Sequence, residues 1–309
     1  MFGTVVLTVL FAFVAQQNPF VGRWNLTGTG DSNAGAVYWL EIKDEGGQLS
    51  GMFLNRGGSP LKLSEVKVQN GELTYQLVRP KQPPINYSAR IEGDKLVGSF
   101  QTEGQTQKMT FAGVRPPRWA AANANARHTF GKPVELFNGT SLDAWDVQHK
   151  SRPMGWAVQD GVMTNEAKAN NLVSKEKFKD FRLQAEYKIE PGSNSGIYLR
   201  GRYELQVLDD FGKPTEEHGH MSIYAWKKPA VNASKPGGEW QTMEATIVGN
   251  KLSVTLNGQK VHDNETIEAI TGGALDANEA EPGPIMIQGD HGKVSFRKIT
   301  VTPIVRPGS

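Results

Sequence analysis

Short runs of alternating apolar and polar residues, separated by tight turns, fill most of the chain after about residue 20. Alternation with a period of two is typical of half-buried strands, because successive strand side chains point to opposite faces. Turn dipeptides such as Asn70-Gly71 and Asn257-Gly258 stand between many runs and favour hairpins that join antiparallel neighbours. The pattern therefore predicts an all-β protein.

The runs fall into two groups on either side of a proline-rich segment. About eight runs lie in residues 20–115, the first unit, which predicts a small antiparallel β-barrel or curled meander. Residues 116–130 begin with two prolines and continue with alanine and asparagine, so we expect a linker there. Residues 131–305, the second unit, are again rich in predicted strands.

The segment from Tyr203 to Leu208 has the most informative pattern. Its odd-numbered positions are apolar, whereas Glu204 and Gln206 share the opposite face of the predicted strand. A carboxylate and an amide side by side on a sheet are suited to a cleft floor that binds a polar ligand such as a sugar. Two long loops, 209–239 and 261–283, are expected to wall this cleft.

Composition excludes several functional classes. A formal net charge of +2 provides no electrostatic attraction for nucleic acid. The chain has no cysteine, so disulfides and thiolate metal sites are excluded, and any metal must bind nitrogen or oxygen ligands. Residues 5–14 form an apolar run like the hydrophobic region of a secretory signal. We therefore expect a signal peptide over residues 1–17, whose removal leaves no stable membrane anchor in the mature chain.

A series of motifs runs through the second unit. They include Glu135-Leu-Phe-Asn-Gly139, Trp156-Ala-Val-Gln-Asp-Gly161, Asn194-Ser-Gly-Ile-Tyr-Leu-Arg200, Tyr203-Glu-Leu-Gln-Val-Leu-Asp209, Gly283-Pro-Ile-Met-Ile-Gln288 and His291-Gly-Lys-Val-Ser-Phe-Arg297. In this order and spacing they resemble the 3-keto-disaccharide hydrolase domain family. The resemblance implies a C-terminal concanavalin A-like jelly-roll sandwich with a ligand cleft on a concave sheet. It also implies a bacterial carbohydrate-processing protein that is periplasmic or secreted.

The strand that carries Glu204 also resembles the catalytic strand of laminarinase-type glycosidases, which have the pattern Glu-x-Asp-x-x-Glu. The spacing is kept here, but Gln206 replaces the middle carboxylate and Asp209 replaces the last glutamate. Hydrolysis with retention requires two carboxyl groups about 5 Å apart. The two replacements therefore argue against simple inheritance of that mechanism.

Four residues in these motifs are candidates for catalysis: Glu204, His291, Asp209 and Arg200. His291 stands in a glycine-flanked turn and titrates near neutrality, as a general base should. Arg200 is expected to share the polar face and to stabilise an oxyanion, and the alternative for it is an ion-pair role. The side chains expected to bind substrate are Gln206, Gln288, Tyr224, Trp226 and Tyr198.

The cofactor is not determined by the sequence, and a divalent metal is one alternative. His218 and His220 have i, i+2 spacing in a predicted loop that also carries carboxylates, which are compatible ligands. The other interpretation is a histidine pair that binds no metal.

Three functions remain open at this point. The resemblance implies an exported enzyme that cleaves the glycosidic bond of 3-keto-glycosides by elimination and hydration, or by hydrolysis. A non-catalytic carbohydrate-binding sandwich and a laminarinase-type glucan hydrolase are the alternatives. In all three cases the partner is an oligosaccharide or glycoside and not a nucleic acid.

Overall fold

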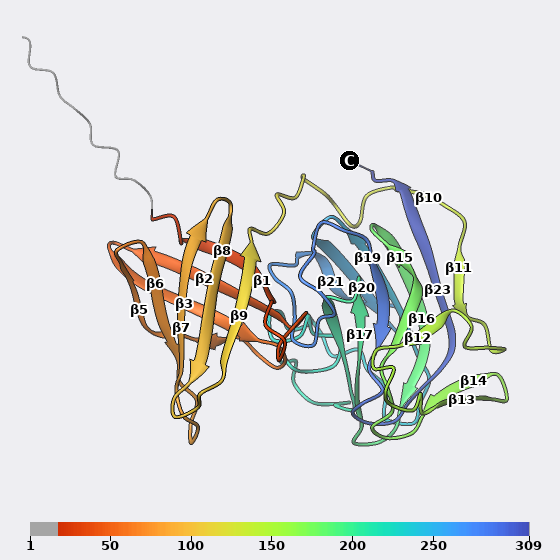
Figure 1. Ribbon diagram of the computed structural model, residues 1–309. Coiled ribbons are helices and arrows are strands. Elements are labelled where there is room, and N and C mark those ends of the chain that lie inside the picture. Colours follow the sequence, from red (N-terminus) through yellow and green to blue (C-terminus); the bar gives the residue numbers. More distant parts are fainter. Residues whose placement is uncertain (1–17, 309) are drawn as a thin grey trace, which may run out of the picture.

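The computed structural model describes residues 18–308, so the expected signal peptide lies outside the described residues. Twenty-three strands and no helix form the regular structure of this range, which confirms the all-β prediction. Residues 18–308 accordingly include no apolar helix of membrane-spanning length. Figure 1 shows a strand-rich unit for each of the two groups of predicted strands.

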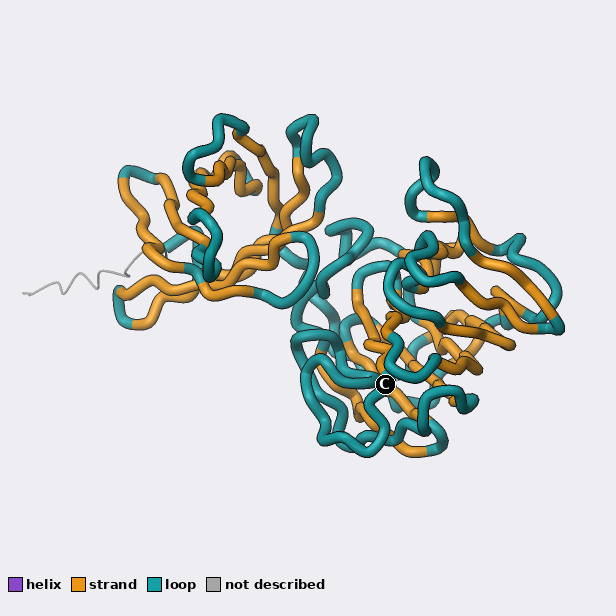
Figure 2. Tube along the Cα trace, turned by 90° about the horizontal axis from the view of Figure 1, so that it is seen from below, coloured by secondary structure: helices purple, strands orange, loops and turns teal. Residues whose placement is uncertain are grey.

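The first unit is one antiparallel sheet of nine strands in the order β4-β3-β2-β1-β9-β8-β7-β6-β5. The strands are β1 Gly22–Gly28, β2 Val37–Glu45, β3 Gln48–Asn55, β4 Leu61–Lys62, β5 Ser64–Gln69, β6 Glu72–Leu77, β7 Ile85–Glu92, β8 Lys95–Thr102 and β9 Lys108–Val114. Leu63, between β4 and β5, donates its amide hydrogen to the Gly51 carbonyl of β3 at 2.9 Å. Strands β4 and β5 stand at the two ends of the sheet and are joined through Leu63, so the sheet curls into a nearly closed barrel (Figure 2).

Aromatic side chains fill the inside of this barrel. Along β6, Leu73, Tyr75 and Leu77 are buried and their neighbours are more exposed, as an amphipathic strand requires. The Tyr75 ring stacks on the Tyr87 ring with 4.6 Å between centroids. The alternation visible in the sequence thus becomes an apolar interior and a polar outer face.

The second unit is a sandwich of two antiparallel sheets. The larger sheet has the order β13-β14-β23-β16-β19-β20-β21, with β10 and β11 paired to β23, and the smaller sheet has the order β12-β15-β22-β17-β18. The strands are β10 Thr129–Phe130, β11 Val134–Phe137, β12 Trp145–Val147, β13 Trp156–Gln159, β14 Val162–Asn165, β15 Leu172–Phe178, β16 Phe181–Ile189, β17 Asn194–Leu199, β18 Tyr203–Leu208, β19 Gln241–Val248, β20 Lys251–Leu256, β21 Gln259–Thr266, β22 Gly283–Ile287 and β23 Val294–Arg306. The arrangement is the predicted concanavalin A-like jelly roll.

The two sheets differ in how their outer faces are covered. Strand β16 alternates between core side chains and partly exposed ones, because its outer face meets water. Strands β17, β18 and β22 are buried almost throughout. Their inner faces supply Ile197, Leu205 and Ile287 to the core of the sandwich. Their outer faces line a cavity that loops partly cover.

The two units also share an apolar contact. Val37, Trp39 and Leu54 of the first unit belong to the same cluster of buried residues as the core of the sandwich. The Trp39 indole N–H donates to the Ile270 carbonyl in the second long loop at 2.9 Å. Such a contact joins residues far apart in the chain, and the local sequence pattern does not predict it.

Candidate functional site

A polar cavity of about 340 Å³ lies over the smaller sheet of the sandwich. Its floor and sides carry side chains that can donate or accept hydrogen bonds, together with several glycines. The lining residues are Gly57, Gly58, Gln148, His149, Asn171, Asn194, Tyr198, Glu204, Gln206, Tyr224, Gly272, Gly273, Met286, Gln288, Asp290 and His291. Six of the predicted site residues are among them: Glu204, His291, Gln206, Gln288, Tyr224 and Tyr198.

Strand register positions the floor of the cavity. Tyr198 of β17 lies opposite Glu204 of β18, and Gly196 lies opposite Gln206. Because side chains alternate along a strand, Glu204 and Gln206 face the cavity and Leu205 packs in the core. This placement is the one that the alternation in the sequence predicts.

A glycine beneath the carboxyl group makes room for it. A Cβ atom on Gly196 would clash with Glu204 Oε1 and would lie 3.0 Å from Gln288 Oε1. Gly196 therefore allows the carboxyl group and the amide to approach the backbone of β17. The sequence shows this glycine in a motif, but only the cross-strand register explains why it has no side chain.

Glu204 is buried, with only 4% of its surface exposed. Burial raises the pKa of its carboxyl group to about 7, although the Tyr198 hydrogen bond and the charge of His291 act in the opposite direction. The Tyr198 hydroxyl lies 2.8 Å from Glu204 Oε2. A carboxyl group with such a pKa is present in both protonation states at neutral pH, as an acid–base catalyst requires.

The hydroxyl group of Tyr198 can serve either protonation state of Glu204. It has one hydrogen but two acceptors at 2.8 Å, namely Glu204 Oε2 and the Gly272 carbonyl. When Glu204 is ionised, Tyr198 donates to the carboxylate. When Glu204 is protonated, its own hydrogen can go to the Tyr198 oxygen, and Tyr198 then donates to Gly272. The Gln288 amide donates to the same oxygen at 3.0 Å and helps to fix the ring.

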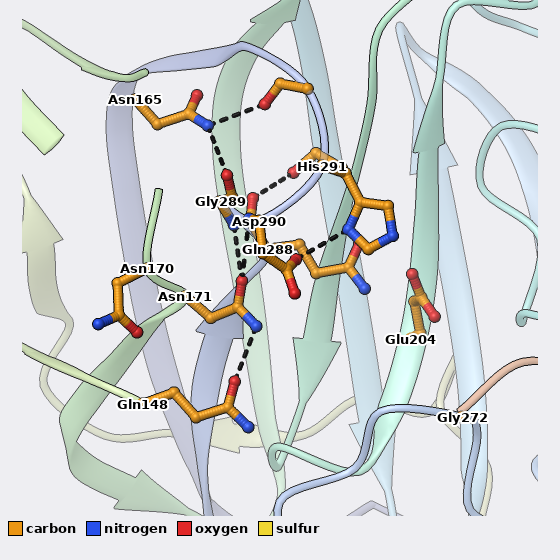
Figure 3. Close-up of polar contacts among 12 residues, drawn as sticks. Gln148, Asn165, Asn170, Asn171, Glu204, Gly272, Gln288, Gly289, Asp290 and His291 are labelled. Carbon is orange, nitrogen blue, oxygen red and sulfur yellow. Dashed lines mark hydrogen bonds and ion pairs between the residues drawn. The ribbon is translucent and has the colours of Figure 1, made fainter. Parts of the chain in front are cut away.

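His291 reaches the cavity from the loop between β22 and β23, paired with the adjacent Asp290. The His291 Nδ1 and Asp290 Oδ1 atoms are 2.8 Å apart. This hydrogen bond is the main cause of a raised His291 pKa and a lowered Asp290 pKa. With Nδ1 held by the carboxylate, the other ring nitrogen is left for a ligand. Figure 3 shows that nitrogen on the side of the cavity that holds Glu204.

Two buried asparagines fix the loop that carries His291 (Figure 3). Asn171 Oδ1 accepts the backbone N–H groups of Gly289 at 2.8 Å and Asp290 at 3.3 Å. Asn165 donates to the Gly289 carbonyl at 3.0 Å and accepts the Val294 N–H at 2.8 Å. These bonds satisfy the polar backbone groups of the loop and hold the imidazole in place.

The structure corrects the expected position of Arg200, which does not line the cavity. Arg200 occupies the turn after β17 with a φ of +54°, in the left-handed region, so the strand alternation ends there. Its guanidinium is buried and donates to the Gly249 carbonyl at 2.7 Å and to Asp180 Oδ1 at 3.0 Å. Arg200 therefore has the alternative role, an ion pair that joins the β17–β18 turn to its neighbours.

Asp209 and Trp226 are also placed away from the cavity lining. The Asp209 carboxylate accepts the N–H groups of Gly192 at 2.8 Å and Gly237 at 3.1 Å, and so it joins two turns. Trp226 packs against Trp39 of the first unit with 5.4 Å between ring centroids. The expected roles of Asp209 as an acid and Trp226 as a sugar platform are therefore corrected to structural ones.

The two histidines of the proposed metal pair have separate partners. His218 Nε2 lies 2.7 Å from the Ser59 hydroxyl at the surface. His220 is buried, and its Nε2 lies 2.7 Å from the Tyr187 hydroxyl, while burial lowers the pKa of its ring to about 4. Among residues 18–308 there is no group of three or more histidine and carboxylate side chains arranged to hold a metal.

Sequence reasoning missed three kinds of site residue. Asp290 was visible beside His291, and an adjacent carboxylate is a usable signal for a fixed imidazole. Asn171 shows no such signal, because its partners Gly289 and Asp290 lie in a loop 118 and 119 positions further along the chain. Gly57 and Gly58 come from the first unit, and only the tertiary structure brings them to the cavity.

These features define a class of protein: a β-sandwich with a polar cleft in which a buried carboxyl group faces a carboxylate-paired imidazole. Comparison with known proteins identifies the family. The chain belongs to the family of 3-keto-alpha-glucoside-1,2-lyase-like domains, which matches residues 132–302. This match confirms the resemblance found in the sequence.

Two relatives illustrate the family. The 3-keto-disaccharide hydrolase of Bacteroides thetaiotaomicron is 25% identical in a region that covers 41% of this chain and 57% of that protein. This chain thus spans little more than half the length of that relative. A crystal structure from Parabacteroides distasonis, provisionally described as a glycosyl hydrolase, is 27% identical with a TM-score of 0.50. The alignment covers 62% of this chain and 93% of that one.

Proposed function

We propose that this chain is an exported carbohydrate-active enzyme that cleaves the glycosidic bond of 3-keto-glycosides. The observation that carries the proposal is the buried Glu204 carboxyl, with a pKa of about 7, in one polar cavity with the His291–Asp290 pair. Membership of the family and the activity named for the Bacteroides relative support the substrate class.

The chemistry of a 3-keto-glycoside requires an acid–base pair. A ketone at C3 acidifies the hydrogen on C2, and a base removes that proton to form an enolate. The enolate collapses by forming the C1–C2 double bond while the C1–O bond breaks, and the leaving oxygen takes a proton. Water then adds to the enone. Each proton transfer needs a positioned group whose pKa lies near the working pH.

Glu204 and His291 fit these two roles. Glu204 with a pKa of about 7 is a stronger base than an ordinary glutamate, and its burial keeps water away from the carboxylate. The hydrogen bond to Asp290 raises the pKa of His291, so its ring keeps a proton to higher pH than a free imidazole and can donate it through Nε2 to the leaving oxygen. When water adds to the enone, the roles are reversed: His291 takes a proton from the water, and Glu204 returns a proton to C2.

The enolate oxygen needs hydrogen-bond donors, and the cavity offers neutral amides for this purpose. Gln206 uses its side-chain oxygen to accept the Val207 N–H at 3.0 Å, so its NH₂ group is the part available to a ligand. Gln206 therefore takes the role that the sequence suggested for Arg200. Fixed amide dipoles in a partly enclosed site stabilise developing negative charge.

The glucan-hydrolase alternative is less well supported by this geometry. A retaining mechanism needs a second carboxyl group about 5 Å from the first. The residue at the matching position, Asp209, accepts two backbone N–H groups outside the cavity. The binding-protein alternative differs from the proposal only in turnover.

A paired assay tests the proposed function. Purified protein is given a 3-keto-disaccharide and its unoxidised parent, and products are followed by chromatography. We expect turnover of the keto sugar alone, slower reaction when C2 carries deuterium, and loss of turnover in Glu204→Gln. Affinity without turnover would leave a binding protein, and cleavage of the parent sugar would indicate a glucan hydrolase.

Two further parts of the proposal rest on the sequence. Export to the periplasm or the medium rests on the apolar run at residues 5–14, and N-terminal sequencing of the mature protein from a bacterial host tests it. Use of a divalent metal is tested in the same turnover assay by chelation followed by addition of single metals.

A further inference from the structure

The first unit contributes directly to the cavity that holds Glu204. Gly57 and Gly58, in the loop that follows β3, line the cavity together with Gly272 and Gly273 of the second unit. One wall of the cavity is therefore built from two chain segments, one from each unit.

The two glycine segments touch through their backbones. The Gly273 N–H donates to the Arg56 carbonyl at 2.8 Å. A Cβ on Gly272 would lie 2.5 Å from the Gly58 carbonyl oxygen and 2.6 Å from its nitrogen, so a side chain there would force the segments apart. The contact is thus specific to glycine and not a loose approach of two loops.

The wall is connected to both the acid–base pair and an aromatic surface. The Gly272 carbonyl is one of the two acceptors of the Tyr198 hydroxyl, whose other acceptor is Glu204. On the other side, the Ser59 hydroxyl lies 2.7 Å from His218, whose ring packs edge-on against Tyr224 at 5.0 Å. Tyr224 lines the cavity and offers a face on which a sugar ring can stack.

We infer that the loop 55–59 of the first unit forms, with Tyr224, a subsite for the second sugar ring of a two-ring glycoside. The inference rests on the proposed function, because the reacting ring is the one that lies at Glu204 and His291. Glycines leave space for a ring and expose backbone N–H and C=O groups to its hydroxyls. The first unit is then a selectivity element, favouring two-ring over one-ring substrates.

The test compares one-ring and two-ring substrates in a variant that fills the subsite. Gly57 has no positive φ, and a Cβ there meets no atom within 4 Å, so Gly57→Trp is compatible with the fold. Ser59→Ala is the second variant, because it removes the bond to His218. Gln48→Trp is the matched control, since Gln48 is an exposed residue at the opposite end of β3.

The measured quantity is the ratio of kcat/KM for a 3-keto-disaccharide to that for methyl 3-ketoglucoside. Gly57→Trp should lower this ratio about tenfold, the size of effect that a single subsite contact has on discrimination. Ser59→Ala should also lower this ratio, and Gln48→Trp should leave the ratio unchanged. An equal loss for both substrates, or no change in the ratio, would overturn the inference.

Calorimetry with the unoxidised disaccharide and its monosaccharide separates this inference from the proposed function. If the wild-type protein turns over neither keto sugar, the proposed function fails. The subsite still predicts tighter binding of the disaccharide, and weaker binding of it in Gly57→Trp. Equal affinities for the two sugars in the wild-type protein would refute the subsite.

Discussion

Replacing Glu204 by glutamine should make the folded protein more stable at alkaline pH while abolishing turnover. The wild-type carboxyl group is buried, and its folded-state pKa is about 7 against 4.5 for an unburied glutamate. Folding therefore favours the protonated form. The stability associated with this group is fully present below pH 4.5 and is lost as the pH rises through 7. A neutral amide in its place does not titrate.

The magnitude follows from the difference between the two pKa values. At 1.36 kcal/mol for each tenfold change in the ionisation constant, the full cost of ionising buried Glu204 is about 3 kcal/mol. Linkage places about 1 kcal/mol of this cost at pH 5 and nearly all of it at pH 8. The stability advantage of Glu204→Gln should therefore grow by about 2 kcal/mol between these two pH values.

Urea unfolding of both proteins at pH 5 and pH 8 measures this change, with tryptophan fluorescence as the signal. The difference between variant and wild type cancels the titration of groups that do not interact with Glu204. Gln206→Asn is the control, because it alters a neutral neighbour on the same strand and should give the same stability change at both pH values. If the Glu204→Gln advantage is constant across the pH range, or shrinks with rising pH, the assignment of a raised pKa is wrong.

Three further substitutions separate catalysis from structure. Gly196→Ala should displace the Glu204 carboxyl and lower kcat roughly a hundredfold while circular dichroism still reports a folded β protein. Arg200→Ala should cost roughly 3–5 kcal/mol in a urea titration because it breaks a buried ion pair, yet leave kcat of the folded protein unchanged; a normal unfolding curve with lost turnover would return Arg200 to the active site. Asn171→Ala should release the His291 loop and move the acidic or basic limb of the pH–rate profile, whereas a purely structural role would lower the melting temperature and leave the profile in place.

Local pattern was sufficient to predict which side chains of β18 face the cavity. Alternation is a property of the extended backbone itself, so Glu204 and Gln206 had to share a face once the segment formed a strand. The same reasoning predicted the all-β class and the hairpins. It failed at Arg200, where the chain leaves the strand with a positive φ and the alternation no longer holds.

The tertiary structure decided which polar side chains are buried and which of them come together at one cavity. The sequence placed Glu204 on a polar face, but its raised pKa comes from burial in the folded protein, which outweighs the opposing effect of the Tyr198 hydrogen bond. Asp209 has the sequence spacing of a catalytic acid, but its carboxylate accepts hydrogen bonds from the N–H groups of Gly192 and Gly237 in nearby turns. Hydrogen bonds to backbone N–H groups are available to any carboxylate near a turn, and sequence spacing does not reveal them.

The contribution of the first unit illustrates the same limit over a longer range. Its strands and turns were predictable from alternation and turn dipeptides, because both act between near neighbours in the chain. That Gly58 would meet Gly272, and that both would line the cavity of Glu204, depends on how two separately patterned units pack. Local propensity determines the strands of this protein, whereas packing between distant segments determines which of its polar residues form a site.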